Sequence, residues 1–403
     1  MAVQSNLSNL PSLASITTGT LFNPLLTGPL LLYVLRHPSV LEKLPWPPTK
    51  YYNLPFDLPF PFPSSIRVGA TPPLKTLKFL FTWGLILSVN RLLNRLALNY
   101  GHLKKQGEPW EFQTEGKETV LITGGCSGFG KEMAKMFAEQ TKAKIVVLDV
   151  QALPDDLKDV PRLSYYKVDL TSPPSIHETI KQVLETSSVP TVLINNAGIA
   201  QAHTILSTSD EFVEKIFRVN VLSHFTLLRL LLPRMMAQRK GHVVTIASMA
   251  SYTGCPSLGD YCATKHAVLG MHESLVAELA TRYKDQGGHC IQATTVHPMW
   301  ARTPLVGSWE RQLVASRAAV LEAKDVAAPV VRHVLTGRSG SVFVPERFRY
   351  ATIAKGLPDW VGIKMRLDLA VNTDVGREAE RETERQALEV KERKGVEESW
   401  VET

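Results

Sequence analysis

From Glu118 onward, short apolar runs alternate with segments in which apolar residues recur every three to four positions. Short apolar runs are typical of buried strands, and the wider spacing is typical of amphipathic helices. The pattern therefore predicts an α/β fold in which helices cover both faces of a doubly wound parallel sheet. The predicted strands are residues 119–123, 144–149, 164–168, 191–195, 241–247, 290–296 and 341–344, and the predicted helices are residues 129–140, 175–186, 211–238, 261–284 and 324–335.

The N-terminal part of the chain follows a different pattern. No charged side chain precedes Arg36, and residues 21–35 are largely apolar, although two prolines and a glycine interrupt them. A secretory signal would begin with basic residues, which are absent here. A transmembrane helix needs ~20 apolar residues. Residues 1–43 are therefore predicted to dip into one leaflet as a hairpin or broken helix, with a true span as the alternative.

Two further segments precede the alternating region. Residues 44–73 contain nine prolines, which remove hydrogen-bond donors and prevent a helix, so we predict an extended linker. Residues 74–105 return to a helical pattern, and their uncharged stretch 79–90 has two basic residues on each side. Basic flanks around an apolar centre suit a helix embedded in a membrane surface. The alternative is a helix that packs on the protein's own catalytic domain.

The charge of the chain is concentrated in this leader. The net charge of the 403 residues is +7, and residues 1–108 carry ten Lys or Arg against three acids, so they hold the whole excess. A neutral remainder argues against a nucleic-acid partner, and a basic leader favours anionic lipid. Solubility or processing of the leader is the alternative explanation. Residues 347–403 are predicted as a helical segment followed by a charged tail, which is a solvated helix or disordered from residue 374 onward.

Cysteines and histidines give no sign of a metal site. The four cysteines, Cys126, Cys255, Cys262 and Cys290, have neither metal-ligand spacing nor a disulfide pattern. Cys126 and Cys262 are predicted to be small apolar fillers in a reducing compartment. The histidines do not cluster, so no metal is expected.

A glycine-rich turn in residues 123–130 joins the first predicted strand to an amphipathic helix. Glycines allow a ligand to approach the backbone, and the helix N-terminus offers free N–H groups and a positive dipole end. Asp149 lies 19 positions after Gly130, at the end of the next strand. A carboxylate there can bind both hydroxyls of an adenosine ribose and repel a 2′-phosphate. No Lys or Arg occupies the positions expected of a phosphate clamp, which favours NAD over NADP.

Tyr261 and Lys265 lie four residues apart on a predicted helix and therefore share a face. A phenol has a pKa near ~10 in water, and a nearby ammonium lowers it. Such a pair alone is commonly a surface pair. Here it follows Ser248, at a strand end, and the run 195–198 of sequence Asn-Asn-Ala-Gly, which ends another strand.

In this order and spacing, the motifs resemble the short-chain dehydrogenase/reductase family in its Tyr-x-x-x-Lys form. Within that family the chain is most similar to hydroxysteroid and retinol dehydrogenases associated with membranes or lipid droplets. The resemblance covers residues 117–346, a little over half of the chain. It implies a Rossmann-like sheet that binds NAD, preceded by a membrane-associated helical leader.

The resemblance also assigns roles to individual residues. Tyr261 is the acid/base, Lys265 tunes it and binds the nicotinamide ribose, Ser248 holds the substrate oxygen, and Asn220 holds a water for proton relay. Asp169 matches the position that holds the adenine ring, although it could simply cap the following helix. Met299 replaces a family glycine, which leaves the path of that loop open. The implied cofactor-binding residues are Gly124, Ser127, Gly128, Phe129, Gly130, Asp149, Asp169, Asn196, Ala197, Gly198, Tyr261, Lys265, Pro298 and Thr303.

The implied reaction is hydride transfer between NAD(H) and a lipophilic alcohol, ketone or aldehyde, such as a retinoid, a steroid or a long-chain lipid. Substrate identity is expected to depend on residues 200–210 and 302–323, which no motif covers. The expected location is the endoplasmic reticulum or the lipid-droplet surface, with the catalytic domain in the cytosol, and a homodimer is left open. The alternatives are an NADPH-dependent lipid ketone reductase and a non-catalytic lipid-surface scaffold.

Overall fold

The computed structural model describes residues 21–42, 50–53, 65–68, 73–307, 309–310, 313 and 320–373. The chain divides into two units, Met1–Ala97 and Leu98–Thr403. The predictions made for residues 1–20, for most of the proline-rich linker and for the charged tail 374–403 fall outside the described residues.

The second unit is built on a sheet of seven strands, all parallel, in the order β11-β8-β7-β6-β3-β4-β5. Strand order reverses between β3 and β6, which creates a crevice at the carboxyl ends of the strands, where ligands bind in sheets of this kind. The strands are β3 (Thr119–Thr123), β4 (Lys144–Asp149), β5 (Leu163–Lys167), β6 (Val192–Asn195), β7 (Gly241–Ile246), β8 (Ile291–Pro298) and β11 (Gly340–Val344).

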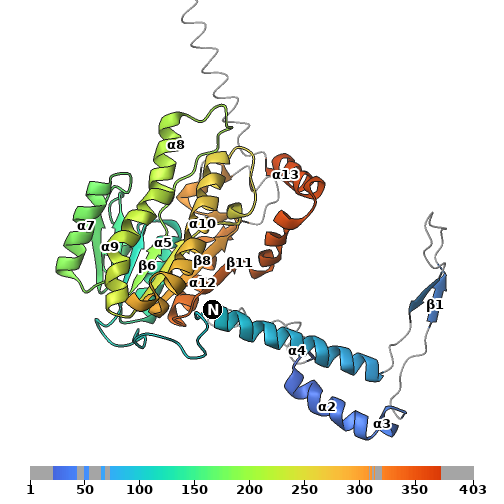
Figure 1. The fold of residues 1–403 in the computed structure, drawn as a ribbon. Coiled ribbons are helices and arrows are strands. Elements are labelled where there is room, and N and C mark those ends of the chain that lie inside the picture. The colour runs from blue at the N-terminus through green and yellow to red at the C-terminus, as the bar shows by residue number, and fades with distance from the viewer. Residues whose placement is uncertain are drawn as a thin grey trace, which may run out of the picture. The chain divides into compact units, whose positions relative to one another are not determined.

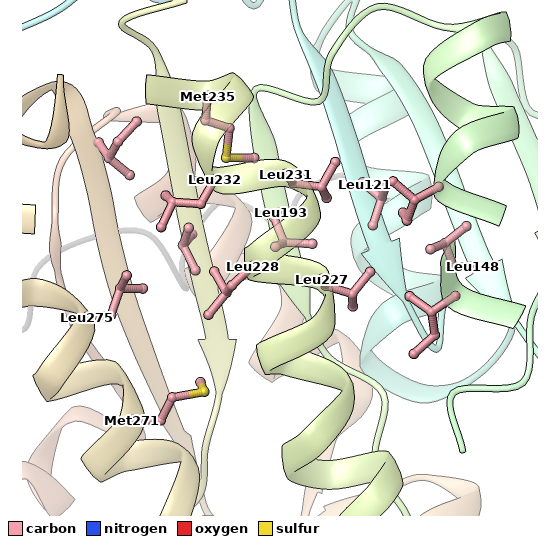
Figure 2. Close-up of a cluster of buried hydrophobic side chains, with 14 of the residues drawn as sticks. Leu121, Leu148, Leu193, Leu227, Leu228, Leu231, Leu232, Met235, Met271 and Leu275 are labelled. Atoms are coloured by element: carbon pink, nitrogen blue, oxygen red, sulfur yellow. The ribbon is translucent and has the colours of Figure 1, made fainter. Parts of the chain in front are cut away.

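Helices cover both faces of this sheet (Figure 1). One face packs on α7 (Pro173–Thr186), α9 (Ser223–Ala237) and α10 (Gly259–Thr281), and leucines and methionines of α9 and α10 meet strand residues such as Leu193 in the core of Figure 2. The other face packs on α5 (Gly128–Gln140) and α12 (Ala323–Leu335). Strands buried on both faces must be apolar throughout, which explains their continuous apolar runs.

The predicted doubly wound α/β fold is confirmed. Every predicted strand overlaps an observed one, with ends that differ by at most two residues. The long helix predicted over 211–238 is α8 (Asp210–Phe217) and α9, joined by a π-helical turn, η2 (Arg218–Leu222). The remaining short elements of this unit are α6 (Asp155–Lys158), η3 (Met249–Ser251), η4 (Lys284–Gln286), η5 (Gly288–Cys290), β9 (Ala301–Arg302), η6 (Pro304–Val306) and β10 (Leu321–Glu322).

The chain continues after β11 into two helical segments that the sequence pattern did not delimit. They are the 3₁₀ segment η7 (Glu346–Gly356) and the helix α13 (Asp359–Thr373). Both carry exposed apolar or aromatic side chains, including Tyr350 and Trp360, which are 74% and 71% exposed. They form the described part of the predicted C-terminal helical segment.

The first unit consists of the helices α2 (Pro24–Arg36), α3 (Ser39–Glu42) and α4 (Pro73–Ala97) and an antiparallel pair, β1 (Lys50–Asn53) and β2 (Ser65–Val68). This strand pair lies within the segment predicted to be an extended linker. A Cβ on Gly84 of α4 would lie 2.2 Å from Phe22 O, so glycine permits the close packing of α2 on α4. Contrary to the expectation of a broken helix, α2 runs through Pro29 without a break.

Apolar side chains cover the outer surfaces of α2 and α4. Leu25 is 81% exposed, and Phe79 and Leu93 are each more than half exposed. Among the described residues, two helices are long and apolar enough to cross a membrane: residues 74–97 and residues 210–237. The latter is largely a core helix of the sheet domain, whereas the former is almost entirely unburied.

Candidate active site

The glycine-rich turn lies at the strand-order reversal, between β3 and α5. Gly124 has a φ of +65°, and a Cβ there would lie 2.8 Å from Ala197 Cα. A Cβ on Gly130 would lie 2.1 Å from Gly124 O, so any other residue would force the turn open. The side chain of Ser127, the N-cap of α5, makes no capping hydrogen bond. The first turn of α5 can therefore present its N–H groups to an anion.

Asp149 closes one side of this turn. Its Oδ2 accepts a hydrogen bond from Cys126 N (2.8 Å), and its Oδ1 accepts one from Gln151 N (3.0 Å). Asp149 is buried, and it also lines the cleft beside the turn. The sequence suggested a ribose-binding role but not this bond, which makes the carboxylate part of the turn itself. Burial, and to a smaller extent the negative charge of Asp149, raises the pKa of Cys126 to about 12. The thiol is therefore neutral and fills space, as predicted.

The segment after β6 faces the glycine-rich turn. Asn196 Nδ2 donates hydrogen bonds to Thr123 O (2.9 Å) and Gly124 O (3.0 Å) and so ties the ends of β3 and β6 together. Ala197 and Gly198 follow along the floor of the cleft. Asp169 accepts hydrogen bonds on Oδ1 from Thr171 N and Thr171 Oγ1. It therefore organises the turn before α7, as the alternative interpretation held, and also lines the cleft.

Tyr261 and Lys265 point inward from α10, and both are buried. Lys265 Nζ lies 5.5 Å from the centre of the Tyr261 ring and donates a hydrogen bond to Ile246 O (2.8 Å) at the end of β7. Burial lowers the pKa of Lys265 to about 8. Burial also raises the pKa of Tyr261, and a hydrogen bond with Ser248 partly offsets that rise. The structure thus brings Ser248, Tyr261 and Lys265 together at the ends of β7 and α10.

Asn220 occupies the π-helical turn η2, and it is fully buried. Its Oδ1 accepts a hydrogen bond from Ile199 N (2.9 Å), and its Nδ2 donates to Ile199 O (3.0 Å) and Thr264 Oγ1 (3.1 Å). Thr264 lies next to Lys265 on α10. Asn220 therefore connects the segment after β6 to the helix that carries Tyr261 and Lys265.

The glycine-rich turn, Asp149, the segment after β6, Tyr261 and Lys265 line a cleft of about 1010 Å³. Its walls mix polar and apolar surface, and we call it the polar cleft because it is the more polar of two adjoining spaces. All the residues for which the sequence predicted cofactor contacts line it except Gly130, which packs against Gly124 within the turn. A smaller cavity of about 240 Å³ adjoins the cleft and has mainly apolar walls. Tyr261, Pro298 and Thr303 line both spaces, whereas Ser248 lines only the apolar cavity.

Walls of the apolar cavity come from several parts of the chain. Ala200, Leu305 and Trp309 lie within the segments that the sequence assigned to substrate identity. The outer wall comes from η7 and α13, which the sequence analysis did not connect with the site. The signal available was the recurrence of apolar residues beyond β11, but it could not show what those residues face.

The remaining candidate residues are structural. Cys262 and the other three cysteines are free and buried. His297 is buried and stacks on Phe343 at the end of the sheet, so it packs locally as expected. No group of three His, Cys, Asp or Glu side chains suited to a metal ion occurs in the described part of the chain.

The polar cleft fits a dinucleotide. Its glycines keep the turn tight, since a Cβ at Gly124 or Gly130 would collide with neighbouring backbone. The N-terminus of α5 can receive a phosphate, and Asp149 stands where a ribose would lie. A sequence profile of the family described as short chain dehydrogenase matches residues 118–313. Dehydrogenase RED2 of Cochliobolus heterostrophus is 36% identical over 191 residues, which cover 47% of this chain and 69% of that protein. Human 17-beta-hydroxysteroid dehydrogenase 13 is 30% identical over 284 residues, which cover 68% of this chain and 91% of that protein.

The chain belongs to the short-chain dehydrogenase family. It is therefore an oxidoreductase of a family that uses NAD or NADP. Among solved structures, a 4-hydroxyisoleucine dehydrogenase in complex with NADH superposes with a TM-score of 0.50 at 25% identity, covering 56% of this chain and 96% of that one. The predicted family and enzyme class are thus confirmed.

Proposed function

We propose that this short-chain dehydrogenase transfers a hydride between NAD(H) and a lipophilic alcohol, or the ketone or aldehyde that the alcohol yields. The observation that carries the proposal is the position of Tyr261, which lines both the polar cleft and the apolar cavity. Its hydroxyl can exchange a proton with a substrate in the cavity while the cofactor occupies the cleft. Ser248 lines the same cavity and is the partner for the substrate oxygen.

Asp149 supports NAD as the preferred cofactor. Its carboxylate would accept hydrogen bonds from ribose hydroxyls and repel the 2′-phosphate of NADP. No Lys or Arg stands at residues 125–127 or 150–151 to offset that repulsion. The similar 4-hydroxyisoleucine dehydrogenase holds NADH, which agrees with this assignment.

When bound, the nicotinamide ring supplies the acceptor or the donor of the hydride. Tyr261 moves the proton at its Oη. Because burial raises the pKa of Tyr261, its hydroxyl is protonated at neutral pH in the ligand-free enzyme, the form that donates a proton to a carbonyl oxygen. In the oxidative direction Tyr261 must first lose its proton, and the ammonium of Lys265 favours the phenolate so formed. This phenolate accepts the proton of the substrate hydroxyl and becomes a phenol again. Asn220 holds the segment after β6 against α10. We propose that it also holds a water that continues the proton path.

The substrate class follows from the cavity walls. Side chains such as Trp309, Leu305 and Leu258 would gain free energy by burying hydrocarbon. The names of the relatives include hydroxysteroid dehydrogenases, and a hydroxysteroid is an alcohol with an apolar body. We propose a steroid, a retinoid or a long-chain lipid.

The exposed apolar surfaces of α2 and α4 support membrane attachment through residues 1–105. A soluble protein rarely leaves such surfaces uncovered. Lys75, Lys78, Arg91 and Arg95 at the two ends of the uncharged stretch suit anionic lipid headgroups. We propose the endoplasmic reticulum or the lipid-droplet surface as the site of attachment, with the catalytic domain in the cytosol. A homodimer stays a prediction.

The replacement Tyr261→Phe tests the proposed function. It is expected to lower kcat by about 10²–10⁴-fold, the usual contribution of a general acid–base group, while NAD still binds. The control Tyr252→Phe removes a different hydroxyl from the same cavity and is expected to keep most of the activity. A Tyr261→Phe enzyme that retains more than about a tenth of the activity would contradict the assignment.

The two alternatives make different predictions. Initial rates with NADH and NADPH distinguish the proposed enzyme from an NADPH-dependent lipid ketone reductase. Absence of turnover with both cofactors across a broad panel of lipid alcohols would favour the non-catalytic scaffold.

A further inference from the structure

The apolar cavity is lined both by the proposed catalytic residues and by the C-terminal segments of the chain. Ser248 and Tyr261 line its inner part, next to the polar cleft. The C-terminal segments η7 and α13 contribute residues such as Phe348, Met365 and Leu369 to its outer wall. The cavity therefore runs from the proposed catalytic residues to the C-terminal part of the chain.

Two charged side chains line this cavity, and both are cations. They are Lys355 of η7 and Arg366 of α13, and no Asp or Glu is among the lining residues that the structure describes. Both residues are exposed, so their charged ends reach solvent while their aliphatic stems line the wall.

Neither cation forms an ion pair or a hydrogen bond with another described residue. Two of the three acids of the same segments lie beside other basic residues: Asp368 pairs with Lys364 at 3.5 Å, and Glu346 lies 4.0 Å from Arg349. The third, Asp359, does not line the cavity. Lys355 and Arg366 are thus positive charges without a described counter-charge at the edge of an apolar cavity. A low-dielectric wall strengthens the attraction of such cations for an anion.

We propose that the cavity selects amphiphilic substrates, with an alcohol or carbonyl group at one end of a hydrocarbon body and an anionic group at the other. Lys355 and Arg366 bind the anion, which is a carboxylate, a sulfate or a phosphate. An ammonium offers three donors, and a guanidinium offers a fork that matches two anionic oxygens. This inference rests on the proposed function, because it assumes that the reacting oxygen lies at Ser248 and Tyr261.

The test compares an ω-hydroxy fatty acid, which has the alcohol and the carboxylate at opposite ends, with its methyl ester, which has the same hydrocarbon body and no charge. The full-length enzyme is expected to prefer the acid in kcat/KM, mainly through KM. Lys355→Gln and Arg366→Gln are each expected to lower the acid-to-ester ratio of kcat/KM by about two- to fivefold, in line with ion pairs at exposed sites, and the double variant by the product. Added salt should reduce the preference of the unmodified enzyme.

Two matched variants control for indirect effects. Lys364→Gln removes a cation of the same helix that pairs with Asp368 and does not line the cavity, so it should leave the ratio unchanged. The exchange Lys355→Arg with Arg366→Lys keeps both charges and should retain the preference for the acid.

Three outcomes separate the possible explanations. Equal kcat/KM for acid and ester in the unmodified enzyme would overturn the inference while leaving the proposed function intact. The double variant could instead lose its binding to phosphatidylcholine vesicles that contain phosphatidylserine while the acid-to-ester ratio of kcat/KM stays unchanged. The two cations would then bind lipid headgroups, and the inference would be wrong. If no substrate were turned over, the proposed function would fail. Calorimetric titration should then still show that the hydroxy acid binds the full-length protein more tightly than it binds the double variant, and this result would support the anion site.

Discussion

Replacing Asp149 with alanine is expected to have two separable effects, one on stability and one on cofactor preference. In the ligand-free protein Asp149 Oδ2 accepts the hydrogen bond of Cys126 N, and both residues are buried. Alanine leaves that N–H without a partner. Gln151 N, which loses its bond to Oδ1, is near solvent, where water can replace the carboxylate.

The size of the stability effect follows from the Cys126 bond. A hydrogen bond to a charged acceptor contributes about 1.5–3 kcal/mol, and a buried donor left unsatisfied costs a comparable amount. We therefore expect Asp149→Ala to lower the free energy of unfolding by about 2 kcal/mol. For a domain of this size, that corresponds to a fall in Tm of roughly 4–8 °C.

The effect on cofactor preference has a different origin. Alanine removes the acceptor of the ribose hydroxyls, so kcat/KM with NAD should fall by about tenfold or more, since tenfold corresponds to about 1.4 kcal/mol. It also removes the negative charge that repels a 2′-phosphate, so kcat/KM with NADP should rise. The ratio of the two values should fall by about 10²-fold.

The matched control is Asp149→Asn, whose side-chain oxygen can still accept from Cys126 N but carries no charge. This variant should recover most of the thermal stability without recovering the preference for NAD. Thermal unfolding of the cofactor-free variants and initial rates with both cofactors provide the two measurements. Equal stability of the alanine and asparagine variants would refute the role of the Cys126 bond, and an unmodified enzyme that prefers NADPH would refute the ribose argument.

Two further predictions concern the buried lysine and the leader. Burial lowers the pKa of Lys265 from its ordinary value of 10.5 to about 8 in the folded protein. The unfolded chain therefore binds more protons between these two pH values, and stability rises with pH there. The difference in unfolding free energy between the unmodified protein and Lys265→Met should therefore rise by about 2 kcal/mol from about pH 8 to pH 10. Urea unfolding at several pH values measures it. A difference that does not change with pH would contradict a buried ammonium at Lys265. Residues 1–105 fused to a soluble reporter should sediment with membranes or coat lipid droplets, whereas the remainder of the chain should not bind. Salt should weaken only the ionic part of the binding, which is about 1 kcal/mol per basic residue. A reporter that stays soluble would show that the helix of residues 74–98 packs on the catalytic domain instead.

The sequence was sufficient for the fold class and for most of the residues that line the candidate cleft. Parallel strands buried on both faces are apolar throughout, so their positions appear directly as apolar runs, as for Thr119–Thr123 and Lys144–Asp149. The pairing of Tyr261 with Lys265 was also predictable, because residues four apart on a helix share a face whatever surrounds them. The glycine at the turn after β3 was predictable for a similar local reason, because Gly124 has a positive φ that favours glycine.

Contacts between distant segments were decided only by the tertiary structure. Asn220 bonds Ile199 and Thr264, which are 21 and 44 residues away, and Asp149 holds Cys126 across 23 residues. The order of the strands in the sheet brings the segments that carry these residues together, and no local sequence pattern encodes that order. The cavity wall formed by η7 and α13 is the clearest case, because an apolar residue looks the same in a sequence whether it faces a core, a substrate or a membrane. Only the packed chain shows that Lys355 and Arg366 line the apolar cavity beside Tyr261.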